Sequence, residues 1–463
     1  MDPRTRRLLE APIGTTLMRL AMPNVLVMVV QSMIGLIETY FVAKLGVDAL
    51  AAMALVFPPY MLLVMVSAGA MGGGILSAIA RALGSGNAER PNSLVWHAIV
   101  ITLVFSAATT ASAWLWGPDL YALMGGRAGS LRDAVLYSNI IFSAAIPLWL
   151  FNSMAATIRA TGNTFLPAAV ISVGAFILIP VSPMLIFGIG PFPALGIAGG
   201  AVAVTIYYVI GGGVFAFYLW SGRGVLKPSR LPPRLRWQPM KEILRVGVAS
   251  SVISLSTNVT AIVATGLAGV VGPVAVAGYG TGVRLEYLLV PLVFGLGQPV
   301  GAMVGTAIGA NRHERALRVA WIGAAIAGGL TEAIGLTAAL FPTAWLNLFG
   351  AEPQMLDVGA NYLRIVGPFY GFFGTGLALY FAAQGAGKLL WPMIAAVTRV
   401  LIAAAGGIVA VRLTHGVPAL FTVLALGLVV FGLMNAAAIA SGALFKRAPA
   451  VIPPAEAVAA GGG

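Results

Sequence analysis

The feature that most constrains this chain is a series of long apolar stretches that recurs from one end to the other. The stretches cover residues 15–43, 49–80, 94–116, 133–159, 165–188, 195–220, 242–271, 275–308, 316–341, 356–384, 389–411 and 416–445. Each exceeds the roughly 20 residues that an α-helix needs to cross the hydrocarbon of a bilayer. Only 9% of the 463 residues are charged, against about a quarter in soluble proteins. The pattern predicts an all-α polytopic membrane protein with 12 transmembrane helices.

The basic residues are distributed unevenly between the two sides of the predicted membrane. One side carries both termini, the central linker and most of the Lys and Arg, whereas the other has only Lys44, Arg127, Arg132 and Arg412. By the positive-inside rule, both termini then lie in the cytoplasm. The excess of Arg over Lys and the abundance of Ala are typical of GC-rich bacteria, so we expect a bacterial inner membrane. The net charge of +13 therefore reflects topology, and no nucleic-acid partner is expected.

The stretch 221–241 is the least apolar part of the interior and is dense in Pro and Arg. Such a composition is typical of an extended linker. It predicts an N-terminal six-helix bundle over 1–220, a cytoplasmic linker over 221–241 and a C-terminal six-helix bundle over 242–445. Residues 446–463 are then a cytoplasmic tail.

The two halves repeat each other at a fixed shift of 225 residues. One register superposes Gly84 on Gly309, Glu89 on Glu314, Tyr137 on Tyr362 and Gly162 on Gly387. Parallel repeats of this kind enclose a cavity between the halves, where alternating access occurs. The repeat predicts two pseudo-symmetric bundles with a central cavity and favours a transporter; duplication retained only for packing is the alternative.

The chain offers few residues for enzymatic or metal chemistry. It has no cysteine, and its histidines, His97, His313 and His415, are far apart in sequence. Thiolate nucleophiles and thiolate metal sites are therefore excluded. A membrane-embedded hydrolase or transferase would need a nucleophile, a base and often metal ligands that converge. We expect no enzyme, no cofactor and no metal site.

Five segments of the chain, in this order, resemble the multidrug and toxic compound extrusion (MATE) transporters. They are residues 84–90, 159–164, 183–191, 304–311 and 384–387. The resemblance covers nearly the whole chain. It implies a secondary antiporter that expels bulky, often cationic organic compounds in exchange for H⁺ or Na⁺. The expected partners are a small organic substrate, the ion and membrane lipid, and the expected state is a monomer.

Three of the 14 carboxylates lie well inside apolar stretches, namely Glu38, Glu286 and Glu332. A carboxylate at this depth costs about 2.5–3.5 kcal/mol to insert, so it usually faces a polar interior and has a role. Glu38 is the first candidate for the coupling ion, because the MATE family usually has an aspartate at this place. Gln31, seven residues earlier, shares its helix face. A packing role for Glu38 near the outer mouth remains the alternative.

Two further positions follow from the same resemblance. Where the family commonly has an aspartate before a proline in its fifth helix, this chain has Ser182 before Pro183. Na⁺ needs several oxygen ligands, whereas a proton needs a single carboxylate, so Glu38 alone indicates H⁺.

Pro23 matches a position at which members of the DinF-like branch are proposed to bend. A static kink is the other reading of Pro23.

The second half contains charges that need partners. Arg284 and Glu286 project about 200° apart around one helix and cannot pair directly. Arg399 is the expected partner of Glu286, because an unpaired buried charge is costly. We favour a structural ion pair, and a transport role stays open. Glu332 has no counterpart in the family and is either a second proton carrier or a surface acid.

Substrate contacts are less well specified, because an adaptable cavity has no motif. Candidates that could touch a flat cation through a thioether or an aromatic face are Met28, Met33, Tyr40, Tyr60 and Tyr279. Helix packing is the commoner role of such residues.

A lipid-linked oligosaccharide flippase of related fold is the rival function. It would need several arginines in its cavity to hold a pyrophosphate. Away from the ends of the predicted helices, the second half offers only Arg284, Arg364 and Arg399, which disfavours this function.

Overall fold

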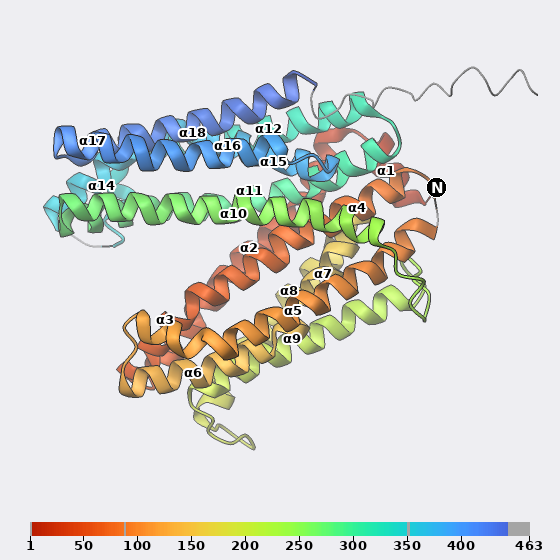
Figure 1. The fold of residues 1–463 in the computed structure, drawn as a ribbon, viewed down its shortest axis with the longest axis horizontal. Helices are drawn as coiled ribbons and strands as arrows, with labels where there is room; N and C mark the ends of the chain where they lie inside the picture. Colours follow the sequence, from red (N-terminus) through yellow and green to blue (C-terminus); the bar gives the residue numbers. More distant parts are fainter. Residues whose placement is uncertain (1, 88, 350–351, 443–463) are drawn as a thin grey trace, which may run out of the picture.

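The computed structural model describes residues 2–87, 89–349 and 352–442, and the side chains of all of these except 29, 31–39 and 47. The described chain is helical and has two bundles (Figure 1). The first bundle contains α2 (Ile13–Ala43), α3 (Val47–Val64), a π-helical segment (Met65–Met71), α4 (Gly72–Gly84), α5 (Glu89–Leu123), α6 (Ala128–Ser143), α7 (Ala145–Ala160), α8 (Phe165–Phe187) and α9 (Ile197–Trp220). The second contains α10 (Trp237–Val271), α11 (Pro273–Gly309), α12 (His313–Leu340), α13 (Pro342–Leu346), α14 (Pro353–Val366), α15 (Tyr370–Ala386), α16 (Leu390–Leu401), α17 (Gly407–Thr414) and α18 (Val417–Ala440).

The described helices confirm the all-α polytopic prediction. Ten helical segments in this part of the chain are long and apolar enough to cross a membrane, and α6 with α7, bent by 45°, make up to 11. The twelfth place is taken by α2, whose described apolar part is Ile13–Met28. The predicted ends differ from the observed ones by a few residues. The largest difference is α5, which extends beyond both predicted ends.

The fourth membrane-spanning segment of each bundle is broken, at the same point of the repeat. In the first bundle the break is at Ala144, between α6 and α7, and Pro147 follows in the first turn of α7. In the second, the 3₁₀ turn Gly367–Phe369 with Pro368 separates α14 from α15. Proline cannot donate to the helical ladder, which explains why each helix is broken here. The shared break is further evidence for duplication.

The N-terminal segment belongs structurally to both halves. An additional helix, α1 (Pro3–Glu10), which the sequence analysis did not predict, precedes α2. Its Leu8 and Leu9, with Leu17 of α2, are buried in the hydrophobic core of the second bundle. Further along, Val27 and Val42 of α2 belong to the core of the first bundle. Figure 1 shows α2 running diagonally from one bundle to the other.

The linker is held against the end of the first bundle. The carbonyl of Ser229 accepts hydrogen bonds from Trp96 Nε1 (3.0 Å) and Trp220 Nε1 (3.1 Å). The backbone N–H of Arg236 donates to His97 Nε2 at 3.0 Å. Because α10 already begins at Trp237, the linker ends before the predicted boundary at residue 241.

Two glycines that the repeat superposes lie where α4 and α11 cross. A side chain on Gly84 would collide with the carbonyl oxygen of Thr306, and one on Gly309 would collide with the carbonyl oxygen of Arg81. The two contacts are equivalent, because a shift of 225 residues also superposes Arg81 on Thr306. The crossing of α4 and α11 is thus a pseudo-symmetric contact in which each helix backbone touches the other bundle.

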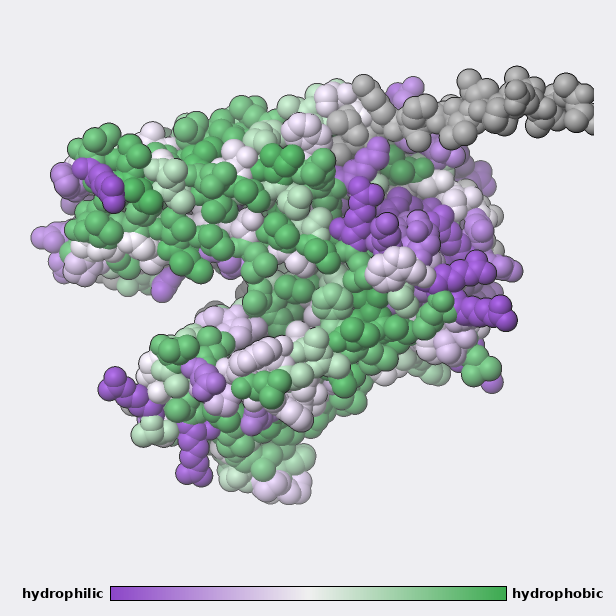
Figure 2. Space-filling model, in the orientation of Figure 1, coloured by the Kyte–Doolittle hydropathy of each residue, from purple (hydrophilic) through white to green (hydrophobic). Residues whose placement is uncertain are grey.

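The bundles separate away from this crossing. Figure 2 shows a cleft between them that opens at the end opposite the N-terminus. Hydrophilic side chains gather at the closed end, and apolar side chains cover much of the helical surface (Figure 2).

Candidate functional site

The closed end of the cleft is fastened by polar contacts between the bundles. Arg81 of α4 pairs with Glu242 of α10 at 2.9 Å, and Arg90 of α5 pairs with the second oxygen of Glu242 at 2.8 Å. Deeper in the molecule, Arg159 Nη1 of α7 donates to Gln298 Oε1 of α11 at 3.0 Å. Any opening of the cleft at this end must break these contacts.

A second group of contacts repeats the first across the pseudo-symmetry axis. Gln384 of α15, which a shift of 225 residues superposes on Arg159, packs its amide against Gly73 of α4, in the place that a larger residue there would occupy. Its Nε2 donates to Ser250 Oγ and to Tyr380 OH, both at 2.8 Å. Each bundle therefore projects one long polar side chain towards the other.

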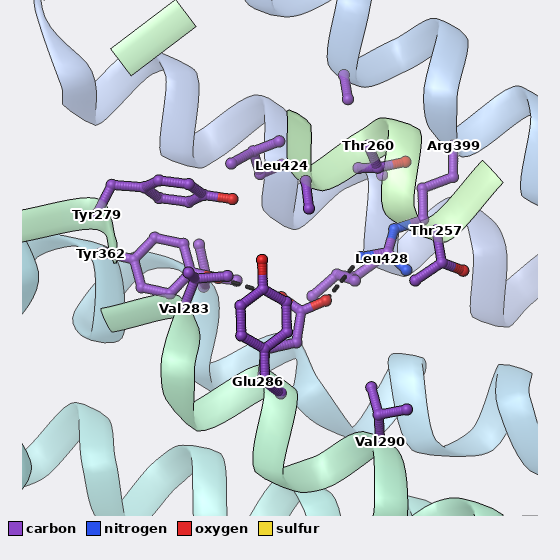
Figure 3. A pocket seen from close by; sticks show the side chains of 15 residues that line it. Thr257, Thr260, Tyr279, Val283, Glu286, Val290, Tyr362, Arg399, Leu424 and Leu428 are labelled. Atoms are coloured by element: carbon purple, nitrogen blue, oxygen red, sulfur yellow. Dashed lines mark hydrogen bonds and ion pairs between the residues drawn. The ribbon is translucent and has the colours of Figure 1, made fainter. Parts of the chain in front are cut away.

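A polar pocket lies inside the second bundle (Figure 3). Arg399 Nη2 of α16 pairs with Glu286 Oε1 of α11 at 2.8 Å, as the sequence predicts. Tyr362 OH of α14 donates to the other oxygen of Glu286 at 3.1 Å. Only 9% of the Arg399 side chain and 12% of the Glu286 side chain are exposed. The carboxylate thus has a partner on each oxygen in a largely enclosed site.

The size of this pocket limits what can occupy it. Its volume is about 40 Å³, whereas one water molecule needs roughly 10–15 Å³ on the same measure. It is lined by Thr257, Thr260, Ala261, Tyr279, Val283, Glu286, Tyr287, Val290, Tyr362, Val366, Arg399, Ala403, Leu424, Gly427 and Leu428. The space accommodates water or a small ion and is too small for a bulky organic compound.

Separating the partners of this ion pair is expected to destabilise the protein strongly. Glu286→Leu leaves the Arg399 guanidinium buried without its carboxylate, which should cost about 3–5 kcal/mol, whereas the double variant Glu286→Leu/Arg399→Met should lose much less. Thermal unfolding of the purified protein measures both. Glu314→Leu is the matched control, because its pair with Arg318 is long, at 3.8 Å, and exposed. Equal losses in the single and double variants would contradict the expectation.

The first-half candidates are only partly within the described structure. The side chains of Glu38, Gln31 and Met33 lie outside the described residues, although the backbone of all three is part of α2. Pro23 lies within α2, which runs as one continuous helix. Ser182 of α8 is buried, and its Oγ has no hydrogen-bond partner among the described residues. The proposed coupling role of this group remains a prediction.

The other charged candidates are placed apart from the pocket. Arg284 is exposed, and its guanidinium lies 4.8 Å from the centre of the Phe349 ring. Glu332 of α12 accepts a hydrogen bond from the backbone N–H of Gly371 at 2.7 Å, in the first turn of α15. Helix starts leave such N–H groups without partners. The contact gives Glu332 a capping position beside the break between α14 and α15.

The suggested substrate residues do not form one group. Tyr279 is buried in the second bundle, where its ring meets that of Tyr362 edge-on at 5.4 Å. In the first bundle, Tyr60 OH lies 3.1 Å from Tyr208 OH. Tyr40 is 59% exposed, and Lys44 Nζ lies 4.6 Å from the centre of its ring. Met28 is half-buried on α2.

Sequence reasoning missed Tyr362 as part of the site. The repeat could have drawn attention to this residue, because it superposes Tyr362 on Tyr137. No cluster of three or more His, Asp or Glu side chains that could hold a metal occurs in the described part of the chain.

Comparisons with known proteins identify the family that shares this architecture. A sequence profile described as MatE matches residues 23–184 and 249–409, one segment in each half. An FAD transporter of Shewanella oneidensis is 27% identical over 373 residues, covering 79% of this chain and 81% of the relative. A probable multidrug resistance protein NorM of Thermotoga maritima is 26% identical over 391 residues, covering 83% of each chain.

Solved structures agree with this fold. A transporter of the MOP superfamily from Pyrococcus furiosus has a TM-score of 0.87 at 22% identity, covering 96% of this chain and all of that chain. A MATE transporter solved in an outward-facing conformation has a TM-score of 0.86 at 22% identity, covering 95% of this chain and 99% of that one. The chain belongs to the MATE family of multi-pass membrane transporters.

Proposed function

We propose that this protein is a secondary antiporter that expels bulky organic compounds, often cationic, from a bacterial cytoplasm in exchange for H⁺. One observation carries the proposal. Two duplicated bundles touch at one end, through the backbones of α4 and α11, and enclose a cleft that opens at the other (Figure 2). A molecule of this shape can expose a central site to either side by rocking one bundle against the other.

The distribution of charge supports an orientation for this conformation. Arg81, Arg90 and Glu242 fasten the closed end, and the same end carries the N-terminus and the Arg-rich linker. By the positive-inside rule, this end faces the cytoplasm. The cleft then opens outward, in the state from which a substrate leaves the cell.

We assign the proton to Glu38 and keep Glu286 as the second ionisable carboxylate. The volume of the Glu286 pocket, about 40 Å³, supports a small ion or water there and a larger substrate elsewhere, in the cleft. The arginines disfavour a flippase, because Arg399 is paired with Glu286 and both Arg284 and Arg364 are exposed. They form no cluster that could hold a pyrophosphate.

Efflux is expected to follow a proton gradient and to persist when Na⁺ is replaced by choline. The reason is that Ser182 stands where the family commonly supplies a second carboxylate, so a Na⁺ site lacks a ligand. The measurement is efflux of a fluorescent organic cation from proteoliposomes, with pH and Na⁺ gradients imposed separately. Empty liposomes under the same gradients are the control. Loss of transport in Na⁺-free buffer would reject proton coupling, and turnover without any gradient would reject antiport.

A further inference from the structure

A large basic pocket lies at the closed end of the molecule, away from the cleft. It has a volume of about 710 Å³ and is formed by α1, the start of α2 and the segment 162–165 before and at the start of α8. The lining comprises Arg4, Arg7, Leu8, Ala11, Pro12, Thr15, Thr16, Arg19, Leu20, Met22, Pro23, Gly162, Asn163, Thr164 and Phe165. We call it the α1–α2 pocket.

The charge of this pocket is uncompensated. Its lining includes Arg4, Arg7 and Arg19 and contains no acidic residue. Arg4 Nη1 donates to the neutral hydroxyl of Tyr218 at 3.0 Å. The guanidinium groups of Arg7 and Arg19 have no hydrogen-bond or ion-pair partner among the described residues. Three guanidinium groups in the lining of one pocket suit a phosphate, which accepts bidentate hydrogen bonds.

The acidic residues of α1 are engaged elsewhere. Asp2 accepts a hydrogen bond from the backbone N–H of Arg4 at 2.8 Å and caps the helix. Glu10 pairs with Arg6 at 2.7 Å and lies 3.7 Å from Arg312. Neither carboxylate lines the pocket. The three arginines of the pocket are exposed and have no acidic partner among its lining residues, so they are available to an anion from outside the chain.

One rim of the pocket is apolar and exposed. Met22 is 71% exposed and Phe165 is 74% exposed. Both belong to apolar helices, α2 and α8, so these exposed side chains are available to the acyl chains of a lipid. A ligand that fits the whole pocket has an anionic head for the arginines and apolar chains for the rim. An anionic phospholipid has this chemistry at this depth.

The two walls of the pocket belong to different bundles. Arg312 Nη1 donates to the carbonyl of Leu9 and Arg315 Nε donates to the carbonyl of Leu8, both at 3.0 Å, so α1 is fastened to the second bundle. The opposite wall, residues 162–165, joins α7 to α8 of the first bundle. A ligand in the pocket touches both walls and stabilises the arrangement in which they are close.

We propose that the α1–α2 pocket binds the phosphate head of an anionic phospholipid, and that this lipid favours the conformation closed at this end. A ligand shifts a conformational equilibrium by its difference in affinity for the two states. Pro23 also lines the pocket, so the lipid lies against α2 where α2 passes from one bundle to the other. The proposal concerns a lipid site and holds whether H⁺ or Na⁺ drives transport.

The test titrates the detergent-purified full chain with phosphatidylglycerol or phosphatidylcholine and follows thermal unfolding. Phosphatidylglycerol should raise the unfolding midpoint and phosphatidylcholine should not. R7Q/R19Q should require more lipid for the same shift, by roughly tenfold for each guanidinium lost. The matched control is R223Q/R230Q, which removes two exposed linker arginines outside the pocket. R7K/R19K keeps the charge without the planar fork, so it should restore part of the affinity.

Each outcome decides the proposal. A response to phosphatidylglycerol that is weakened in R7Q/R19Q and unchanged in R223Q/R230Q supports it. An equal response in both variants would show general attraction to a basic surface and would reject the α1–α2 pocket as a specific site. Equal stabilisation by glycerol 3-phosphate, which has the phosphate and no acyl chains, would overturn the lipid and leave a soluble phosphate as the ligand. Because unfolding is measured without a gradient, failure here is distinct from failure of the antiport.

Discussion

Replacing Glu38 with glutamine is expected to reduce proton-coupled efflux to the level of empty liposomes while substrate binding persists. The substitution keeps the shape and the hydrogen-bonding capacity of the side chain but removes its titration. A proton drives the cycle only if it binds the two conformations with different affinity, so the coupling group must change its environment between them. Glu38 lies in α2, the helix that runs from one bundle to the other (Figure 1). Efflux driven by a pH gradient and equilibrium binding of the same substrate are measured on one preparation.

The controls separate coupling from packing. Glu314→Gln changes an exposed acid in the first turn of α12 and should leave efflux unchanged. If Glu38 only packs, Glu38→Gln should transport nearly normally and Glu38→Ala should fail to express. Wild-type rates with an unchanged pH profile in Glu38→Gln would refute the assignment. The coupling group would then have to be sought at Glu286 or Glu332.

The repeat made most of the fold predictable. Long apolar stretches identify helices because a bilayer leaves few other structures possible, and the 225-residue register assigns them to two bundles. The ion pair between Glu286 and Arg399 followed from the cost of a buried charge. The helix α1 was not predicted, because eight residues rich in Arg carry no apolar stretch. Its place became clear only from its contacts with the second bundle.

The missing part of the site depends on distances between helices. Tyr362 and Glu286 are 76 residues apart, and nothing in their spacing indicates that one binds the other. The basic pocket combines Arg4, Arg19 and Phe165 from three helices. In the sequence, these arginines only indicated topology. A pattern along the chain reports which residues share a face of a helix, whereas contacts between bundles need the packing itself.

A bulky side chain at the crossing of α4 and α11 is expected to force the closed end open and to abolish efflux. In Gly84→Leu or Gly309→Leu, the new side chain meets a backbone carbonyl of the other bundle, and a backbone cannot move aside as a side chain can. Overpacking of this kind costs about 1–3 kcal/mol. If the cost applies only to the closed-end conformation, it shifts the equilibrium between the two conformations by roughly fivefold to 150-fold.

Two pairs of spin labels on the cysteine-free chain measure this shift. Labels at Glu89→Cys and Glu314→Cys report on the closed end, and labels at Leu123→Cys and Leu348→Cys, both highly exposed, report on the open end. In the leucine variants the first distance should lengthen and the second should shorten. Gly212→Leu and Gly329→Leu are the matched controls, because nothing lies within 4 Å of a side chain at either position. If the leucine variants kept both wild-type distances, or the controls changed them equally, then the crossing would not be the contact that holds this end closed. The bundles would then have to be held there by the polar contacts, namely the ion pairs of Glu242 and the hydrogen bond between Arg159 and Gln298.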